Sequence, residues 1–219
     1  MKIDVSGRSM IEVIGVLVII GMLSIGGIVG YSRAMTKYRI NKTINEVTRL
    51  VQGIHTLYMS QKNYSGLCDN KAQLSPNIAK FKNLFGFNAR GSNVFGGKWY
   101  VFNHHPNNNS NGSNSYPLEQ LSTAFVVVFT GVPEEACMTL ATTDWRSSGD
   151  GLIGFGIGNS DTSRPATNIK RKDCPQGKMV SSSGGYYLCA QDMPMKPSDA
   201  VTACSTSNNN SYTFSFKYK

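Results

Sequence analysis

The sequence predicts an α+β protein: one long N-terminal helix packed against a small antiparallel β-sheet head. Three observations predict it: an uncharged apolar run near the start, a helical stripe directly after it, and several β-branched and aromatic runs further on. A length of 219 residues suits one domain with an appendage. An apolar content of 40% is enough to form a folded core.

The first element is the apolar run, because no Asp, Glu, Lys or Arg occurs from Val13 to Tyr31. As a helix this run would span about 28 Å, close to the hydrocarbon thickness of a bilayer. A removed secretory signal is the alternative, but the run is longer than usual and continues into a helical segment without a small-residue cleavage site. We therefore expect a retained transmembrane helix within residues 8–35.

The helix is expected to continue as an amphipathic segment over residues 36–60. Apolar residues recur there at spacings of four and three, which is the period of one helix face. They are Ile40, Ile44, Val47, Val51, Ile54 and Tyr58. We expect this stripe to pack under a globular head formed by residues 61–219; a coiled-coil partner is the competing explanation.

The head contains several strand signals. Residues 98–102 read as a strand, and the near-continuous apolar run at 124–129 reads as a central one. Residues 179–180 and 186–189 flank a Ser- and Gly-rich turn and predict a hairpin. The period-two alternation of 212–218 predicts a last strand whose aromatic residues face inward, namely Tyr212, Phe214, Phe216 and Tyr218.

The segment 103–115 is rich in Asn, Ser and His and predicts an exposed loop. Its adjacent pair, His104 and His105, has no Cys or carboxylate nearby, so we expect no metal site there.

Glu12 stands at the edge of the apolar run, with apolar neighbours on both sides. A carboxylate at the centre of a bilayer costs about 2.5–3.5 kcal/mol, and less near the interface. Two interpretations follow: a flanking residue at the membrane surface, or a charge that awaits a positive partner.

Gly7, followed by an apolar run with Glu12 five residues on, resembles the start of type IV pilins and their pseudopilin relatives. The resemblance implies that residues 1–7 are a prepilin leader, which prepilin peptidase removes by cutting between Gly7 and Arg8. It also implies N-methylation of Arg8 as the new N-terminus. Glu12 would then serve subunit assembly by pairing with the α-amino group of a neighbouring subunit, a burial that is tolerable because both charges are present.

Two features depart from the usual pilin pattern. The mature chain would begin with Arg8 where most pilins have an apolar residue, and Gly26 and Gly30 occupy a region where many pilins have Pro. Glycines there could loosen the helix locally.

The chain has five cysteines, and none forms a CxxC pair, which disfavours zinc. Any one of the five can be left over while the others pair in three ways, so fifteen arrangements of two disulfides exist. Disulfides are expected if the head is exported, with reduced buried thiols as the alternative. Cys174 and Cys189 bracket the predicted hairpin and could close it.

Residues 131–137 and 203–218 resemble the C-terminal head of type IVb pilins. This resemblance implies a disulfide between Cys137 and Cys204, with Cys68 free or paired with another chain.

The sequence shows no nucleophile elbow, zinc-protease motif or phosphate loop. The glycines at 154–158 lack the spacing and the following helix of a nucleotide loop, so we expect a tight strand with close backbone approach instead. We therefore expect no enzyme activity, no catalytic residue, no cofactor and no metal site. A net charge of +9 favours anionic partners.

Together these features predict a structural subunit of a type IV pilus for adhesion, motility or DNA uptake, which polymerises with itself. The implied partners are prepilin peptidase, the inner-membrane assembly platform and other pilins, with DNA or an anionic host surface as a further candidate. The precursor is expected in the bacterial inner membrane, N-terminus in the cytoplasm and head in the periplasm, before it joins an extracellular pilus. Basic residues after the span favour the opposite orientation, but the resemblance and the cysteines outweigh them.

Three alternatives stay open: a minor pilin, a type II secretion pseudopilin, or a membrane-anchored module that binds DNA or anionic surfaces.

Overall fold

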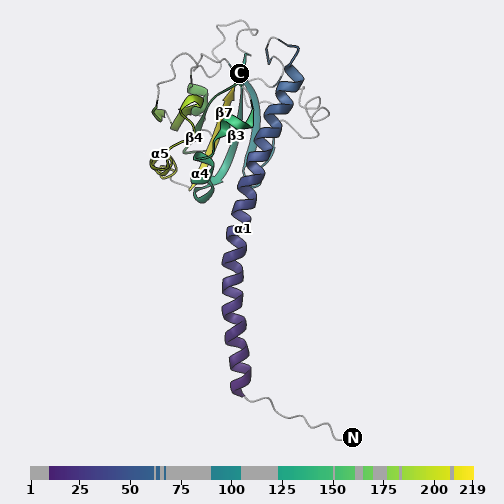
Figure 1. The fold of residues 1–219 in the computed structure, drawn as a ribbon, viewed down its shortest axis with the longest axis vertical. Helices are drawn as coiled ribbons and strands as arrows, with labels where there is room; N and C mark the ends of the chain where they lie inside the picture. Colours follow the sequence, from purple (N-terminus) through teal and green to yellow (C-terminus); the bar gives the residue numbers. More distant parts are fainter. Residues whose placement is uncertain are drawn as a thin grey trace. The chain divides into compact units, whose positions relative to one another are not determined.

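A computed structural model gives the fold (Figure 1). It describes residues 10–61, 63–64, 67, 90–104, 123–149, 151–160, 165–169, 177–182, 184–207 and 210–219. By its internal contacts the chain divides into two units, Met1–Arg39 and Ile40–Lys219. Four residues with predicted roles lie outside the described residues: Gly7, Arg8, Cys68 and Cys174.

The N-terminal element is a single α-helix, α1 (Met10–Tyr58), of 49 residues. It contains no proline, and its first turn carries Glu12, where the helix macrodipole favours a negative charge. The predicted long helix is therefore confirmed. The division of the chain at residues 7, 35 and 60 stays a prediction.

The head contains one seven-stranded antiparallel sheet in the order β1-β2-β3-β7-β4-β6-β5. Its strands are β1 (Arg90–Ser92), β2 (Lys98–His104), β3 (Ala124–Pro133), β4 (Leu152–Gly158), β5 (Val180–Ser182), β6 (Gly185–Cys189) and β7 (Ser211–Tyr218). The predicted strands and the β5–β6 hairpin are present, and the α+β fold class is confirmed.

Strand β7 joins the two parts of the sheet, although it is the last element in the chain. Phe216 lies opposite Val127 of β3 on one side and opposite Phe155 of β4 on the other. Strands β4, β5 and β6 can therefore join β3 in one sheet only after β7, the C-terminal strand, lies between β3 and β4.

The core lies between one face of the sheet and the second half of α1. The residues of α1 that are buried there are Ile40, Thr43, Val47, Leu50, Val51 and Ile54. Ile44 and Tyr58, which the predicted stripe also includes, are partly buried against the same cluster. The four aromatic residues of β7 that the alternation places inward are all buried in this cluster, which confirms the prediction.

Five short helical elements complete the described head. They are α4 (Glu134–Ala141), α5 (Pro197–Ala203), and the 3-10 helices η1 (Trp145–Ser148), η2 (Pro165–Asn168) and η4 (Ala190–Asp192). Helix η2 packs directly onto β4, where a Cβ added at Gly156 would lie 2.5 Å from the backbone nitrogen of Ala166. The prediction that the glycines of 154–158 allow close backbone approach in a strand is confirmed.

The prediction of a loop over residues 103–115 is wrong for its first two residues. Asn103 and His104 extend β2, where they lie opposite Phe125 and Ala124, and His104 is buried. Pairing with the long strand β3 outweighs the local composition. The rest of this segment, from residue 105, lies outside the described residues.

The second face of β7 is also buried, which a period-two pattern does not predict. Thr213, Ser215 and Lys217 have no exposed surface. The Nζ atom of Lys217 donates a hydrogen bond to the backbone oxygen of Ile169 at 2.6 Å. Burial lowers the pKa of Lys217 from 10.5 to about 7, because the charged form is poorly solvated there.

This burial predicts a pH dependence of stability. Between pH 7 and 10.5 the unfolded chain binds the Lys217 proton that the folded chain releases, so stability should rise with pH over this window. The slope from one such group is at most about 1.4 kcal/mol per pH unit. Replacing Lys217→Met should flatten the rise, as measured by thermal unfolding of the full chain in detergent.

Lys178→Met, at an exposed position, is the matched control and should leave the slope unchanged. Equal slopes for the wild type and the Lys217 variant would contradict the assignment.

Candidate assembly surface

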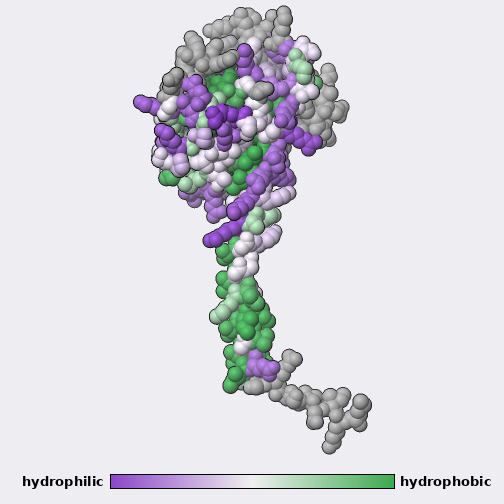
Figure 2. All heavy atoms as spheres, viewed as in Figure 1, coloured by the Kyte–Doolittle hydropathy of each residue, from purple (hydrophilic) through white to green (hydrophobic). Residues whose placement is uncertain are grey.

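The first half of α1 exposes apolar side chains. Ile19 is 60% exposed and Ile28 is 70% exposed, and every large apolar side chain between them is exposed as well. The most apolar 18-residue window of α1 has a mean hydropathy of 2.6, and none of it is buried. Figure 2 shows apolar residues gathered on the N-terminal part of this helix.

A helix that is apolar on all sides belongs in a membrane or inside a protein assembly, not in water. By length and composition α1 is the one helix among the described residues that could cross a membrane.

Glu12 is the exception within this apolar surface. It lies in the first turn of α1, between Ile11 and Val13. The first cationic residue of the described α1 is Arg33, which lies about 32 Å further along the helix at 1.5 Å per residue. Within its own described helix, Glu12 therefore has no positive partner in reach.

The second candidate region consists of helices α4 and α5. The disulfide between Cys137 and Cys204 links them, with 5.9 Å between the two Cα atoms. Small residues allow this close approach, since the buried positions of the two helices include Ala136, Ala141, Ala200 and Ala203. The predicted Cys137–Cys204 disulfide is confirmed.

Cys189, at the end of β6, is also disulfide-bonded. Its partner lies outside the described residues, so the predicted pairing with Cys174 stays a prediction.

A ring contact and a hydrogen bond tie the disulfide region to the sheet. The indole nitrogen of Trp145 donates to the backbone oxygen of Leu140 at 2.8 Å, and its ring lies 4.4 Å from that of Phe216 in β7. The Tyr212 hydroxyl donates to the backbone oxygen of Cys204. These contacts hold α4 and α5 in a fixed position against β7.

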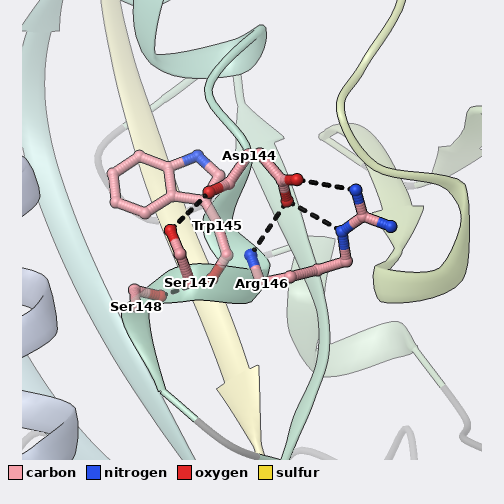
Figure 3. A network of polar contacts seen from close by, with 5 residues as sticks. All are labelled: Asp144, Trp145, Arg146, Ser147 and Ser148. Atoms are coloured by element: carbon pink, nitrogen blue, oxygen red, sulfur yellow. Dashed lines mark hydrogen bonds and ion pairs between the residues drawn. The ribbon is translucent and has the colours of Figure 1, made fainter.

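The turn after α4 is built around Asp144 and Arg146 (Figure 3). The Asp144 carboxylate accepts hydrogen bonds from the Arg146 backbone nitrogen at 3.1 Å and from its guanidinium at 2.8 and 2.6 Å. The guanidinium hydrogen bond lowers the pKa of Asp144. Both side chains are exposed, so the pair contributes little to stability and mainly fixes the turn. The spacing of these residues carries no signal that sequence reasoning could use.

The described residues contain no group of three or more His, Cys, Asp or Glu side chains that could hold a metal ion.

The disulfide is expected to contribute strongly to the stability of the head. Cys137 and Cys204 are 67 residues apart, and closing a loop of this length stabilises by about 4 kcal/mol in the chain-entropy description. Replacing both cysteines by Ser should lower the free energy of unfolding accordingly, as measured by denaturant unfolding of the full chain in detergent.

Thr202→Ser, an exposed change on α5, is the control and should behave like the wild type. An unchanged stability of the double Cys variant would contradict the tethering role.

Comparison with known proteins identifies this architecture. The bundlin family model matches residues 32–219. The major structural subunits of bundle-forming pilus from Escherichia coli O111:H- and O127:H6 are each 25% identical over 212 residues, covering 96% of this chain and 94% of the relative.

Two solved structures are also similar. TcpA, a type IV pilin from Vibrio cholerae El Tor biotype, matches with a TM-score of 0.50 and 15% identity over 83% of this chain and 99% of that chain. A type IVb pilin from Salmonella typhi matches with a TM-score of 0.47 and 14% identity, over 82% and 99% of the two chains.

The likeness to TcpA confirms the pilin fold. The predicted relationship to type IV pilins is likewise confirmed, and enzyme activity is no part of a structural pilin. Because the family model covers most of the sequence, the chain belongs to the bundlin family.

Proposed function

We propose that this chain is the major structural subunit of a type IVb, bundle-forming pilus. The observation that carries the proposal is the exposed apolar half of α1, in a helix whose other half is part of a folded head. Copies of the chain can cover this surface by packing their N-terminal helices together. The relatives named above, which are major subunits, favour a major over a minor pilin or pseudopilin.

The apolar half of α1 would meet two surroundings in turn, first lipid and then other copies of itself. Lipid tails are as apolar as Leu, so the transfer from membrane to filament gains little hydrophobic free energy. Close packing and specific polar pairs must therefore fix how one subunit is positioned against the next. Between Met10 and Tyr31 of α1, Glu12 is the one charged residue, so it could supply such a pair.

Processing would create the partner of Glu12. In this proposal the prepilin peptidase cuts between Gly7 and Arg8, the new terminal amine is methylated, and Glu12 becomes the fifth residue. The carboxylate would then pair with the terminal amine of a neighbouring copy. Leaving one member of a buried ion pair without the other is strongly destabilising, so the pair would act as a registry device.

The location of the precursor follows from the same features. We propose an inner-membrane precursor with a periplasmic head, supported by the disulfide-bonded cysteines, since such bonds persist in oxidising compartments. The assembly platform and other pilins are proposed partners, together with the peptidase.

Replacing Glu12→Ala should leave the protein in the membrane but reduce filaments on the surface by at least about a hundredfold, since a lone buried charge costs about 3–5 kcal/mol. Glu12→Gln, which keeps the shape and removes the charge, should behave similarly. The readout is the ratio of sheared to membrane-bound protein on immunoblots.

Lys178→Met, which removes an exposed charge of the head outside both proposed contacts, is the control and should give a normal filament yield. Normal filament yield from both Glu12 variants would contradict the registry role.

Mass spectrometry of sheared surface material checks the processing. The N-terminal peptide should begin at Arg8 and carry the added mass of one methyl group. A surface protein that begins at Met1 would contradict the proposed cut.

A further inference from the structure

We infer that the exposed face of α4 and α5 docks onto the outward face of the α1 segment 42–49 of a neighbouring copy. This inference rests on the proposed filament function and names a contact within it. The evidence is an acidic pair on the first surface, Glu134 and Glu135, and a cationic pair on the second, Lys42 and Arg49.

The first surface lies beside the Cys137–Cys204 disulfide. Glu134 and Glu135 form the first turn of α4, and both are exposed. Neither takes part in an ion pair within the described chain, where Arg146–Asp144 is the salt bridge present. In the following turn of α4, Met138 is 38% exposed, and Val201 on α5 is 50% exposed.

This surface combines an acidic edge with exposed apolar side chains, which is unusual for the head. Within the described part of Ile40–Lys219 the exposed large apolar side chains are Met59, Met138 and Val201, so two of the three belong to these helices. The disulfide and the buried alanines hold the surface rigid, and a rigid patch loses little conformational entropy on binding.

The second surface is the side of α1 that faces away from the core. Lys42 and Arg49 are seven residues apart, so they lie on the same side of the helix, about 10 Å apart along its axis. Both are exposed, whereas Val47 and Val51 on the opposite side are buried. Glu46, one helical turn from Lys42, is half-buried; burial raises its pKa, and the charge of Lys42 opposes that rise. Arg49 and the outward side of Lys42 remain exposed to a neighbouring copy.

The two surfaces are complementary in charge and in chemistry. Copies with a net charge of +9 repel one another, so a stable contact must bring acidic groups against basic ones. Lys42 and Arg49 can converge on an acidic pair that lies between them. Their aliphatic stems can then cover Met138 and Val201 while the charged ends reach the carboxylates.

Charge reversal with rescue tests this contact in the full chain in its host. Glu134→Lys with Glu135→Lys, or Lys42→Glu with Arg49→Glu, should each lower the yield of sheared filaments about tenfold, and the four changes together should recover most of it. Because carboxylates at the start of α4 also favour their own helix, Glu134→Gln with Glu135→Gln is included and should give an intermediate loss.

Two controls separate assembly from folding. Each variant should accumulate in the membrane at wild-type level and form the Cys137–Cys204 disulfide, as read from non-reducing peptide maps. A photo-crosslinker placed at Val201 should join neighbouring copies through a peptide that contains residues 42–49.

The outcomes distinguish this contact from the filament function itself. Normal filaments from both reversed variants, or crosslinks only to other peptides, would overturn the docking contact while leaving the filament role intact. A wild-type chain that forms no filaments would instead overturn the proposed function. The variant with all four changes has complementary charges again, with the signs exchanged. Recovery of its filament yield supports the contact, because damage to the fold of either surface would not be repaired by the second pair of changes.

Discussion

The rest of this molecule depends on one constraint: the first half of α1 presents apolar side chains that its own described chain does not bury. A surface of this kind requires lipid or protein around it. The chain belongs to the bundlin family, and the proposed pilus role supplies one such setting, a filament built from many copies. The second half of the same helix, from Ile40 on, is part of the folded head, where it packs on the sheet.

The head is built to be held as one rigid piece. Its C-terminal strand, β7, lies between β3 and β4, and Phe216 contacts both the sheet core and Trp145. The Cys137–Cys204 disulfide fixes α4 and α5 beside that strand. A rigid head can present acidic and apolar groups in a constant geometry, which repeated contacts along a filament need.

Much of the fold follows from the sequence because its signals are local and strong. The apolar run is recognised by its length without charge, whereas the three–four stripe from Ile40 and the aromatic alternation in β7 each follow one period; the structure confirms all three. The disulfide came from resemblance to type IVb pilins, since spacing alone left fifteen arrangements. The misses arise where distant segments decide the outcome. Pairing with β3 extends β2 as far as His104. Lys217 donates its hydrogen bond to Ile169, the residue after η2, which is distant in the sequence.

The central claim is that the apolar half of α1 forms the core of a filament of identical copies. Electron cryomicroscopy of sheared filaments tests it most directly. The account predicts a central bundle made of the Met10–Gly30 segments of neighbouring subunits, with Glu12 within ion-pair distance of the terminal amine of the next copy. A filament whose core is formed by the heads, with this segment exposed at its surface, would contradict the account.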